Sequence, residues 1–366
     1  MATGTTIPEA AVDPPETIPI RTDEDFDHQR LKEYLAGKLP DSDLALEIVQ
    51  FPGGHANLTY LLRYGGEREY VLRRPPLGPV APGSHDMGRE YRTLSCLYKG
   101  YQPAPRAYVF CGDPAVIGGP FFVMERRCGI VVRRTIPEQF GGGRDADVNR
   151  RISEVLIDAL ADLHSVDYNA VGLGDIGKPD GFLRRQVDGW AGRYDRAKTK
   201  EIPLVAEMTA WLRDNLPKSP GPALLHNDWR LDNMMLDNND PGRCEAVFDW
   251  DMCTLGDPLA DLGTLLSAWI EESEMIGQGQ VGMPSNTPGF MTRRQAVERY
   301  GQRSGIDVSD VPYYYVFGIY KIAVVLQQIY VRFHRGQTQD KRFESMGQAA
   351  EMLFWRAKEQ SEKRNV

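Results

Sequence analysis

Apolar and polar residues follow different patterns in the two parts of the chain. In the first part, short apolar runs bounded by glycine, proline and polar residues predict strands at residues 44–51, 58–64, 70–74, 107–111 and 121–125. Before them, apolar residues recur at helical intervals over residues 26–39, which predicts a helix that Gly37 and Pro40 end. The first part is therefore expected to be mainly strand.

After residue 125 the apolar spacing is mainly helical. Residues 149–164 place one set of aliphatic side chains on a single face, as in an amphipathic helix: Ile152, Val155, Leu156, Ala159, Leu160 and Leu163. Further helices are predicted within 182–216, as a pair, and at 295–303, 313–333 and 343–363. Because Lys321, Gln327 and Gln328 interrupt the most apolar of these, at 313–333, we expect a buried core helix rather than a membrane span.

The composition of the 366 residues is that of a soluble protein, long enough for two lobes with a large core or for two modest domains. Residues 1–22 are rich in proline, threonine and glutamate and are predicted to form a flexible tail. The start lacks the basic and apolar runs of a secretory signal. The formal net charge of -8 argues against a nucleic-acid partner. We expect no membrane partner, and the sequence assigns no oligomeric state.

Cysteine usage bears on the compartment. The chain has 5 cysteines, and none of them forms a Cys-x-x-Cys pair: Cys96, Cys111, Cys128, Cys244 and Cys253. An odd number without such a pair argues against a disulfide framework or a zinc site and favours a reducing cytoplasm.

One polar loop carries the candidate chemistry. His226, Asp228 and Asn233 lie between two short apolar runs, 224–225 and 234–236. A third run, 246–248, ends at Asp249. Phosphoryl transfer from a nucleotide needs a carboxylate to receive the acceptor proton and oxygen ligands to hold magnesium against the phosphates. The order His-x-Asp-x4-Asn followed by a later Asp is that of eukaryotic-type kinases.

This order suggests Asp228 as the base and Asn233 and Asp249 as metal ligands. Taken singly, each of these residues could be structural, because Asp and Asn are common in turns. Asp251 lies two residues after Asp249, and on a short extended segment the two side chains would point the same way. It could therefore reach a second metal ion, or it could be solvated.

The same stretch resembles the aminoglycoside phosphotransferase and choline kinase superfamily, which shares the protein-kinase fold. More narrowly, residues 249–262, DWDMCTLGDPLADL, and residues 163–167, LHSVD, resemble the phosphotransferase domain fused to some acyl-CoA dehydrogenases. The resemblance covers residues 48–335. It implies a kinase-like α+β fold with a small antiparallel-sheet lobe at 23–125, which binds nucleotide. A larger, mainly helical catalytic and acceptor-binding lobe would occupy 126–366.

The resemblance also implies where the nucleotide binds. A turn at 52–57 would cover the phosphates through Gly53 and Gly54, with Asn57 as a polar contact. Without the resemblance it would be an ordinary hairpin.

Arg73 stands where the kinase pattern expects a lysine, and Glu90 would be its partner on the next helix. The alternative for these two residues is a surface ion pair. Glu125 would lie at the crossing between the lobes, near the nucleotide base, and the residues do not distinguish ATP from GTP.

The predicted reaction is transfer of the γ-phosphoryl group of ATP or GTP, with Mg²⁺, to a hydroxyl group of a small molecule, with His226 bracing the loop. A basic run favours an anionic acceptor, for which the narrower resemblance suggests a hydroxyacyl-CoA: Arg184, Arg185, Arg193, Arg196, Lys198 and Lys200. That run could also be a solvated face.

Two alternatives compete with this reading. One is a catalytically silent nucleotide- or acyl-CoA-binding module, which Arg73 and the irregular glycine turn favour. The other is a protein kinase. The sequence argues against this alternative, because it contains neither the Asp-Phe-Gly nor the Ala-Pro-Glu motif. His164, Asp257 and Asp261 are expected to be structural, the two aspartates as caps at the start of the helix that follows residue 256.

Overall fold

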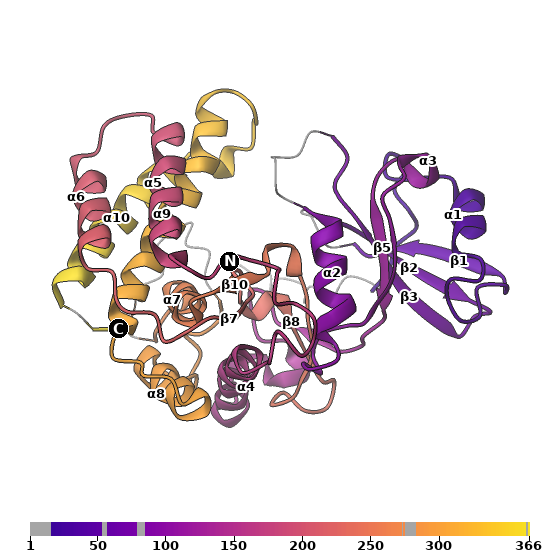
Figure 1. Ribbon diagram of the computed structural model, residues 1–366, viewed down its shortest axis with the longest axis horizontal. Helices are drawn as coiled ribbons and strands as arrows, with labels where there is room; N and C mark the ends of the chain where they lie inside the picture. Colours follow the sequence, from indigo (N-terminus) through magenta and orange to yellow (C-terminus); the bar gives the residue numbers. More distant parts are fainter. Residues whose placement is uncertain (1–15, 53–56, 79–84, 273, 275–282, 364) are drawn as a thin grey trace, which may run out of the picture. The chain divides into compact units, whose positions relative to one another are not determined.

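The computed structural model describes residues 16–52, 57–78, 85–272, 274, 283–363 and 365–366 (Figure 1). Gly53 and Gly54 of the predicted nucleotide turn lie outside the described residues, as do residues 1–15 of the predicted tail. The chain divides into two compact units. The first comprises Met1–Tyr91 and Ala107–Arg126, and the second comprises Arg92–Arg106 and Arg127–Val366.

The first unit is built on a 5-stranded antiparallel sheet with the strand order β1-β2-β3-β5-β4. All the strands predicted from apolar runs are present: β1 (Leu46–Gln50), β2 (Leu58–Tyr64), β3 (Arg68–Arg74), β4 (Ala107–Cys111) and β5 (Phe121–Glu125). The helix α3 (Pro114–Ile117) and the start of α2 (Met87–Leu97) also belong to this unit.

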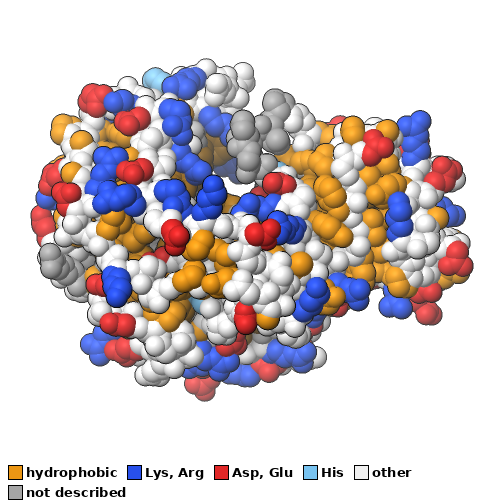
Figure 2. Space-filling model, in the orientation of Figure 1, with side chains coloured by type: hydrophobic (Ala, Val, Ile, Leu, Met, Phe, Trp, Pro, Cys, Tyr) orange, Lys and Arg blue, Asp and Glu red, His pale blue; other side chains and the backbone are white. Residues whose placement is uncertain are grey.

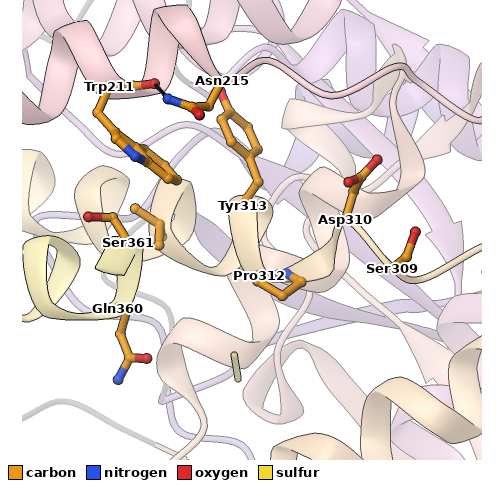
Figure 3. Close-up of a pocket in the computed structure, with 9 residues that line it drawn as sticks. Trp211, Asn215, Ser309, Asp310, Pro312, Tyr313, Gln360 and Ser361 are labelled. Atoms are coloured by element: carbon orange, nitrogen blue, oxygen red, sulfur yellow. Dashed lines mark hydrogen bonds between the residues drawn. The ribbon is translucent and has the colours of Figure 1, made fainter. Parts of the chain in front are cut away.

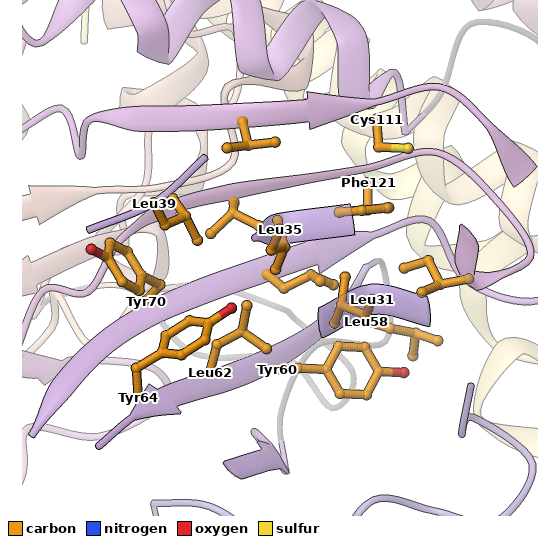
Figure 4. Close-up of a cluster of buried hydrophobic side chains, with 14 residues drawn as sticks. Leu31, Leu35, Leu39, Leu58, Tyr60, Leu62, Tyr64, Tyr70, Cys111 and Phe121 are labelled. Carbon is orange, nitrogen blue, oxygen red and sulfur yellow. The ribbon is translucent and has the colours of Figure 1, made fainter. Parts of the chain in front are cut away.

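One face of this sheet carries the core of the first unit. The helix α1 (His28–Leu35) inserts Leu31 and Leu35 among buried side chains of the sheet that include Tyr60 and Phe121 (Figure 4). Burying a leucine of this kind contributes about 1.5–3 kcal/mol. The alternation of side chains along the strands therefore fixes which face α1 covers.

The helix predicted over 26–39 is shorter than expected. It begins where the side chain of Asp27 accepts the backbone N–H of Arg30 at 2.9 Å. It stops at Leu35, because Ala36 has φ -55° and ψ 125°, outside the helical region, and Gly37 has φ 72°. Glycine adopts that left-handed conformation without the steric cost that a Cβ would add.

The tail predicted to be flexible as far as residue 22 is attached to the sheet earlier. Ile18 forms two backbone hydrogen bonds with Gln50, of 2.7 and 2.9 Å, at the open edge of β1. Ile20 packs against the core. The prediction of a flexible tail used the low apolar content of the whole segment and so did not take account of the contacts that these two isoleucines make.

The second unit is mainly helical, and its helices match those predicted from helical spacing. They are α4 (Ala146–His164), α5 (Phe182–Ala197), α6 (Pro203–Asp214), α7 (Pro258–Ala268), α8 (Arg293–Ser304), α9 (Val311–His334) and α10 (Met346–Lys363). Two small antiparallel sheets carry the loops between them. One contains β6 (Ile130–Val131), β8 (Met234–Leu236) and β9 (Cys244–Val247), and the other contains β7 (Ala223–Leu225) and β10 (Thr254–Gly256).

Within the described ranges, α9 is the helix whose length and apolar composition would allow it to cross a membrane, a test that core helices also pass. Half of its most apolar window is buried. It packs against α7 and α10, and Tyr314, Tyr315 and Tyr320 are fully buried. These contacts are those of a core helix.

Two glycines allow α7 and α9 to approach closely. A Cβ added to Gly263 would lie 2.3 Å from the carbonyl oxygen of Tyr314, and one added to Gly318 would lie 2.4 Å from the carbonyl oxygen of Gly263. Both neighbours are backbone atoms that cannot rotate away. By contrast, a Cβ added to Gly189 in α5 would meet no atom within 4 Å.

We predict opposite effects for the same substitution at these positions. Gly318→Ala should lower the free energy of unfolding by about 1–3 kcal/mol, because it overpacks the crossing of α7 and α9. Gly189→Ala should raise it by up to about 1 kcal/mol, because alanine favours the helix and no atom is displaced. Urea unfolding followed by circular dichroism measures both, and an unchanged or higher stability of Gly318→Ala contradicts the close approach.

Candidate active site

Strand pairing brings the two parts of the predicted site together. The candidate catalytic loop, residues 226–233, called the catalytic loop below, joins β7 to β8, and β8 pairs with β9 in antiparallel register. The pairing continues beyond the strands, because the N–H of Phe248 donates to the carbonyl oxygen of Asn233 at 2.9 Å. Asp249 follows directly. The fold therefore places the backbone of Asp249 next to the end of the catalytic loop.

Asn233 closes the catalytic loop onto Asp228. Its Nδ2 donates to the carbonyl oxygen of Asp228 at 2.9 Å and to the carboxylate Oδ2 of the same residue at 3.0 Å. The backbone turns through the short 3₁₀ helix η2 (Leu231–Asn233) to make these contacts. Because Nδ2 is engaged in both, Oδ1 is the atom of Asn233 that can ligate a cation.

His226 braces the loop from inside. It is fully buried, with its ring centroid 4.8 Å from that of Trp250 and 5.6 Å from that of Trp229. Its Nε2 lies 2.8 Å from the carbonyl oxygen of Phe248, so Nε2 donates. Its Nδ1 accepts the backbone N–H of Asp228 at 3.3 Å. One imidazole thus links Asp228, the candidate base, to the end of the strand before Asp249.

The segment after β9 differs from the expectation. Asp249 has φ 68° and ψ 58°, a left-handed conformation, and residues 250–252 form the 3₁₀ helix η3 (Trp250–Met252). The extended segment assumed for residues 249–251 is therefore wrong. The argument that Asp251 points the same way as Asp249 fails with it, and a ligand role for Asp251 stays a hypothesis.

The donor set fits a hard cation. Asn233 and Asp249 would offer amide and carboxylate oxygens, which are the ligands that magnesium takes from proteins. Among the described residues, no group of three or more His, Cys, Asp or Glu side chains is arranged to hold a metal ion. Magnesium in nucleotide sites usually has only one or two carboxylate ligands, with phosphates and water completing the set.

Asp261 holds the loop in place from the first turns of α7. Its carboxylate accepts the backbone N–H of His226 at 2.6 Å and that of Asn227 at 2.8 Å. His164 lies 3.5 Å from the same carboxylate, and its other ring nitrogen lies 2.7 Å from the hydroxyl of Tyr300.

Asp257 caps α7 as expected, with its side chain accepting the N–H of Leu259. Asp261 does not, so its prediction as a cap is wrong.

The charge on Asp261 is stabilised although the residue is buried. Burial alone would raise its pKa, but a hydrogen bond and electrostatic attraction from His164, with further contributions from His226, hold the pKa below its ordinary value. The ionised form is the one that accepts two backbone N–H groups. The predicted structural role of His164 fits these contacts.

Of the residues predicted to bind nucleotide in the first unit, Arg73 and Glu90 are in direct contact. Arg73 on β3 and Glu90 on α2 form a buried ion pair, with Nη1 2.8 Å from Oε1 and an exposed fraction of 0% for the Glu90 side chain. The surface pair considered as an alternative is therefore excluded. Asn57, just before β2, is buried, and its Oδ1 lies 3.0 Å from Nδ1 of His85. Glu125 ends β5, opposite Tyr70.

Two cavities of the second unit lie elsewhere. One, of about 220 Å³, has residues of α6, α9 and α10 in its wall, including the stacked rings of Trp211 and Tyr313 (Figure 3). The other, of about 490 Å³, is lined in part by α4, with Asp158 and Asp162 in its wall. Neither is lined by a predicted site residue.

Two residues that contact the catalytic loop, Lys321 and Asp261, were not predicted to do so, although each is an isolated ionisable residue in an apolar helix. Lys321 is a lone cation in the middle of an apolar helix, and its Nζ donates to the carbonyl oxygen of Asn227 at 2.9 Å. Asp261 is a lone acid on the otherwise apolar face of α7. An ionisable residue in such surroundings is costly without partners, which marks both positions for attention.

Residues 47–286 match the sequence model of the phosphotransferase enzyme family. This chain belongs to that family. It is 33% identical over 329 residues to acyl-CoA dehydrogenase family member 11 of Gallus gallus, an alignment that covers 87% of this chain and 41% of the relative. The chain therefore spans less than half the length of that relative.

Solved structures confirm the fold of this phosphotransferase family member. A protein from Ralstonia eutropha JMP134, provisionally described as an aminoglycoside phosphotransferase, is 29% identical with a TM-score of 0.80. The match covers 93% of this chain and 99% of that one. A choline kinase of Cryptosporidium parvum superimposes with a TM-score of 0.62 at 11% identity, covering 92% and 96% of the two chains. The predicted kinase-like α+β fold and the resemblance to these families are confirmed.

We predict that Asp261→Asn destabilises the protein by about 3 kcal/mol, because a buried acceptor of two N–H groups loses its charge. The folded-state pKa is lowered, so this stabilisation is complete above the ordinary aspartate pKa of about 3.9. It is lost as the pH falls through the folded pKa. Urea unfolding of the variant and wild type at several pH values should therefore show a gap at pH 7 that narrows in acid. A gap of equal size throughout contradicts the assignment.

Proposed function

We propose that this protein is an ATP- or GTP-dependent small-molecule kinase that transfers the γ-phosphoryl group to a hydroxyl group. Family membership and the kinase-like fold support the phosphotransferase class. The observation that carries the proposal is the closure of Asn233 onto Asp228 beside the strand end that leads into Asp249. A purely structural turn does not require this combination.

The roles follow from the contacts. Asn233 donates to Oδ2 of Asp228, which leaves Oδ1 to accept the proton of the acceptor hydroxyl. His226 and Asp261 hold the backbone of the loop so that the carboxylate is in place before the acceptor arrives. Asn233 and Asp249 would hold magnesium, which when bound offsets the charge of the phosphates.

In the first unit, Arg73 would neutralise phosphate charge, and Glu90 fixes its direction. A guanidinium can fork onto phosphate oxygens, although its shape differs from that of the lysine expected there. The glycines of the turn at 52–57 would complete the phosphate contacts, and Glu125 would lie near the base.

The acceptor that we propose is a hydroxyacyl-CoA or a related anion. Two observations support this choice. The chain is similar to a relative named as an acyl-CoA dehydrogenase family member, and basic side chains gather along α5 (Figure 2). A polycationic aminoglycoside would instead need an acidic pocket. We also propose a cytoplasmic location, because all 5 cysteines are free.

A silent nucleotide- or acyl-CoA-binding module of the same fold is the second candidate. The observation in its favour is the buried ion pair between Arg73 and Glu90, because Arg73 replaces the lysine of active kinases. The two candidates differ in turnover. A silent module would be stabilised by nucleotide but would consume none with any acceptor.

We predict that Asp228→Ala keeps nucleotide binding and lowers turnover at least about a hundredfold, since general-base help is typically worth about 10²–10⁴ in rate. Nucleotide consumption with Mg²⁺ would be followed against a panel of hydroxyacyl thioesters, sugars and amino alcohols. Calorimetry would report nucleotide affinity. Glu298→Gln, which removes a carboxylate from an exposed pair with Arg294 on α8, is the matched control.

Turnover of Asp228→Ala equal to that of wild type would remove Asp228 from the base role. Stabilisation of the wild type by nucleotide, with no consumption on any acceptor in the panel, would favour the silent module. Glu298→Gln should match wild type in both measurements.

A further inference from the structure

Two cations share one aromatic ring where α5 packs against α9. Trp190 is buried, and the guanidinium carbon of Arg193 lies 4.3 Å from its ring centroid. The ammonium of Lys321, from α9, lies 5.7 Å from the same centroid. An indole face attracts a cation, but two cations over one ring also repel each other.

Cations near this pair differ in whether they have a carboxylate partner. Lys198 pairs with Glu201 at 2.6 Å and Lys200 with Glu351 at 2.7 Å, whereas Arg184 and Arg185 donate to backbone carbonyl oxygens. Within the part of the chain that the structure describes, neither Arg193 nor Lys321 forms an ion pair. Neither cation at Trp190 is therefore in direct contact with a carboxylate.

Lys321 connects this pair to the catalytic loop. Its ammonium donates to the carbonyl oxygen of Asn227, the residue immediately before Asp228. Burial lowers the pKa of Lys321, although the charges of Asp261 and Asp228 oppose that effect. An anion bound here would lie close to the hydroxyl that Asp228 deprotonates.

Two glycines, Gly189 and Gly192, lie beside Arg193 on α5. Gly189 lies one turn before Arg193 and so shares its face. A Cβ at Gly189 would meet nothing within 4 Å, and one at Gly192 would meet only the Nη1 of Arg196, at 3.4 Å. Each glycine inside a helix costs roughly 0.5–1 kcal/mol relative to alanine. Packing accounts for the glycines that separate α7 from α9, but not for these two.

We propose that Arg193 and Lys321 bind an oxyanion of the acceptor, and that the bare surface at Gly189 and Gly192 accommodates the chain that carries it. The inference rests on the proposed kinase function and identifies the residues that select the acceptor. The oxyanion could be the carboxylate of a free hydroxy acid or a phosphate of a coenzyme A thioester. Both offer the same chemistry to a guanidinium and an ammonium.

The first test measures binding without turnover. Coenzyme A and 3-hydroxybutyrate are titrated separately into wild type, Arg193→Gln and Gly189→Gln, with calorimetry and tryptophan fluorescence as readouts. One of the two should bind to wild type with a change in fluorescence, and both variants should weaken it about tenfold or more, the value of one charged hydrogen bond. The probe that binds identifies the source of the oxyanion.

Two further variants separate a binding role from a folding role. Arg193→Lys should recover part of the affinity, because it keeps the charge. Arg213→Gln removes an exposed cation of α6 and should bind as wild type does. Gly189→Gln should unfold at a urea concentration no lower than wild type, so any loss of affinity in it comes from the filled surface.

The second test uses acceptors that differ in charge. The 3-hydroxybutyryl thioester of coenzyme A, free 3-hydroxybutyrate and neutral 3-hydroxybutyramide are compared in the kinase assay. Arg193→Gln should raise KM about tenfold for the anionic acceptor that is used, with kcat within about twofold, and should leave KM for the amide unchanged.

The outcomes for the two proposals are distinct. If no acceptor is phosphorylated by wild type but a probe binds and Arg193→Gln weakens it, the kinase function fails and the oxyanion site stands. If neither probe binds to wild type, or if the variants bind as wild type does, the oxyanion site is overturned. An equal loss on the charged and neutral acceptors also overturns it.

Discussion

The position of the catalytic loop depends on one buried carboxylate. Asp261 accepts two successive backbone N–H groups, those of His226 and Asn227, from a place in the core that water does not reach. A backbone N–H left unpaired in such surroundings is costly, so the loop conformation that satisfies both donors is strongly preferred. Asn227 reaches it with φ 66°, a left-handed conformation that asparagine tolerates better than most residues. The candidate base comes next in the chain, so its orientation follows from this contact.

Most of the fold and the composition of the candidate site could be predicted from the sequence. Strands and helices follow from local apolar spacing, and the order of His226, Asp228, Asn233 and Asp249 along the chain suggests the chemistry. Local spacing cannot show which distant residue a side chain reaches. Asp261 lies four residues after Asp257, the N-cap of α7, and only the tertiary fold reveals that it holds another loop. The backbone at Asp249 was mispredicted because alternation assumes an extended chain, which a left-handed residue interrupts.

The pair formed by Arg73 and Glu90 shows how a departure from a family pattern can be accommodated. The guanidinium is larger than an ammonium, yet both side chains are buried and only 2.8 Å separates their charged atoms. A buried charge without a partner would be strongly destabilising, so the arginine and the glutamate depend on each other. The substitution therefore preserves a positive charge at the end of β3 while fixing its direction through α2.

The near contact of α7 and α9 at Gly263 and Gly318 has a consequence for how such enzymes diversify. The first helix carries Asp261 and the second carries Lys321, so the supports of the loop lie on two elements that are locked together. The outer helix α5 supplies Arg193 and two glycines without joining that lock. In the acceptor site that we propose, replacements on the solvent-facing side of α5 would alter which molecule is recognised. The inner side of α5, which includes the buried Trp190, would stay packed, and the supports of the loop would keep their geometry.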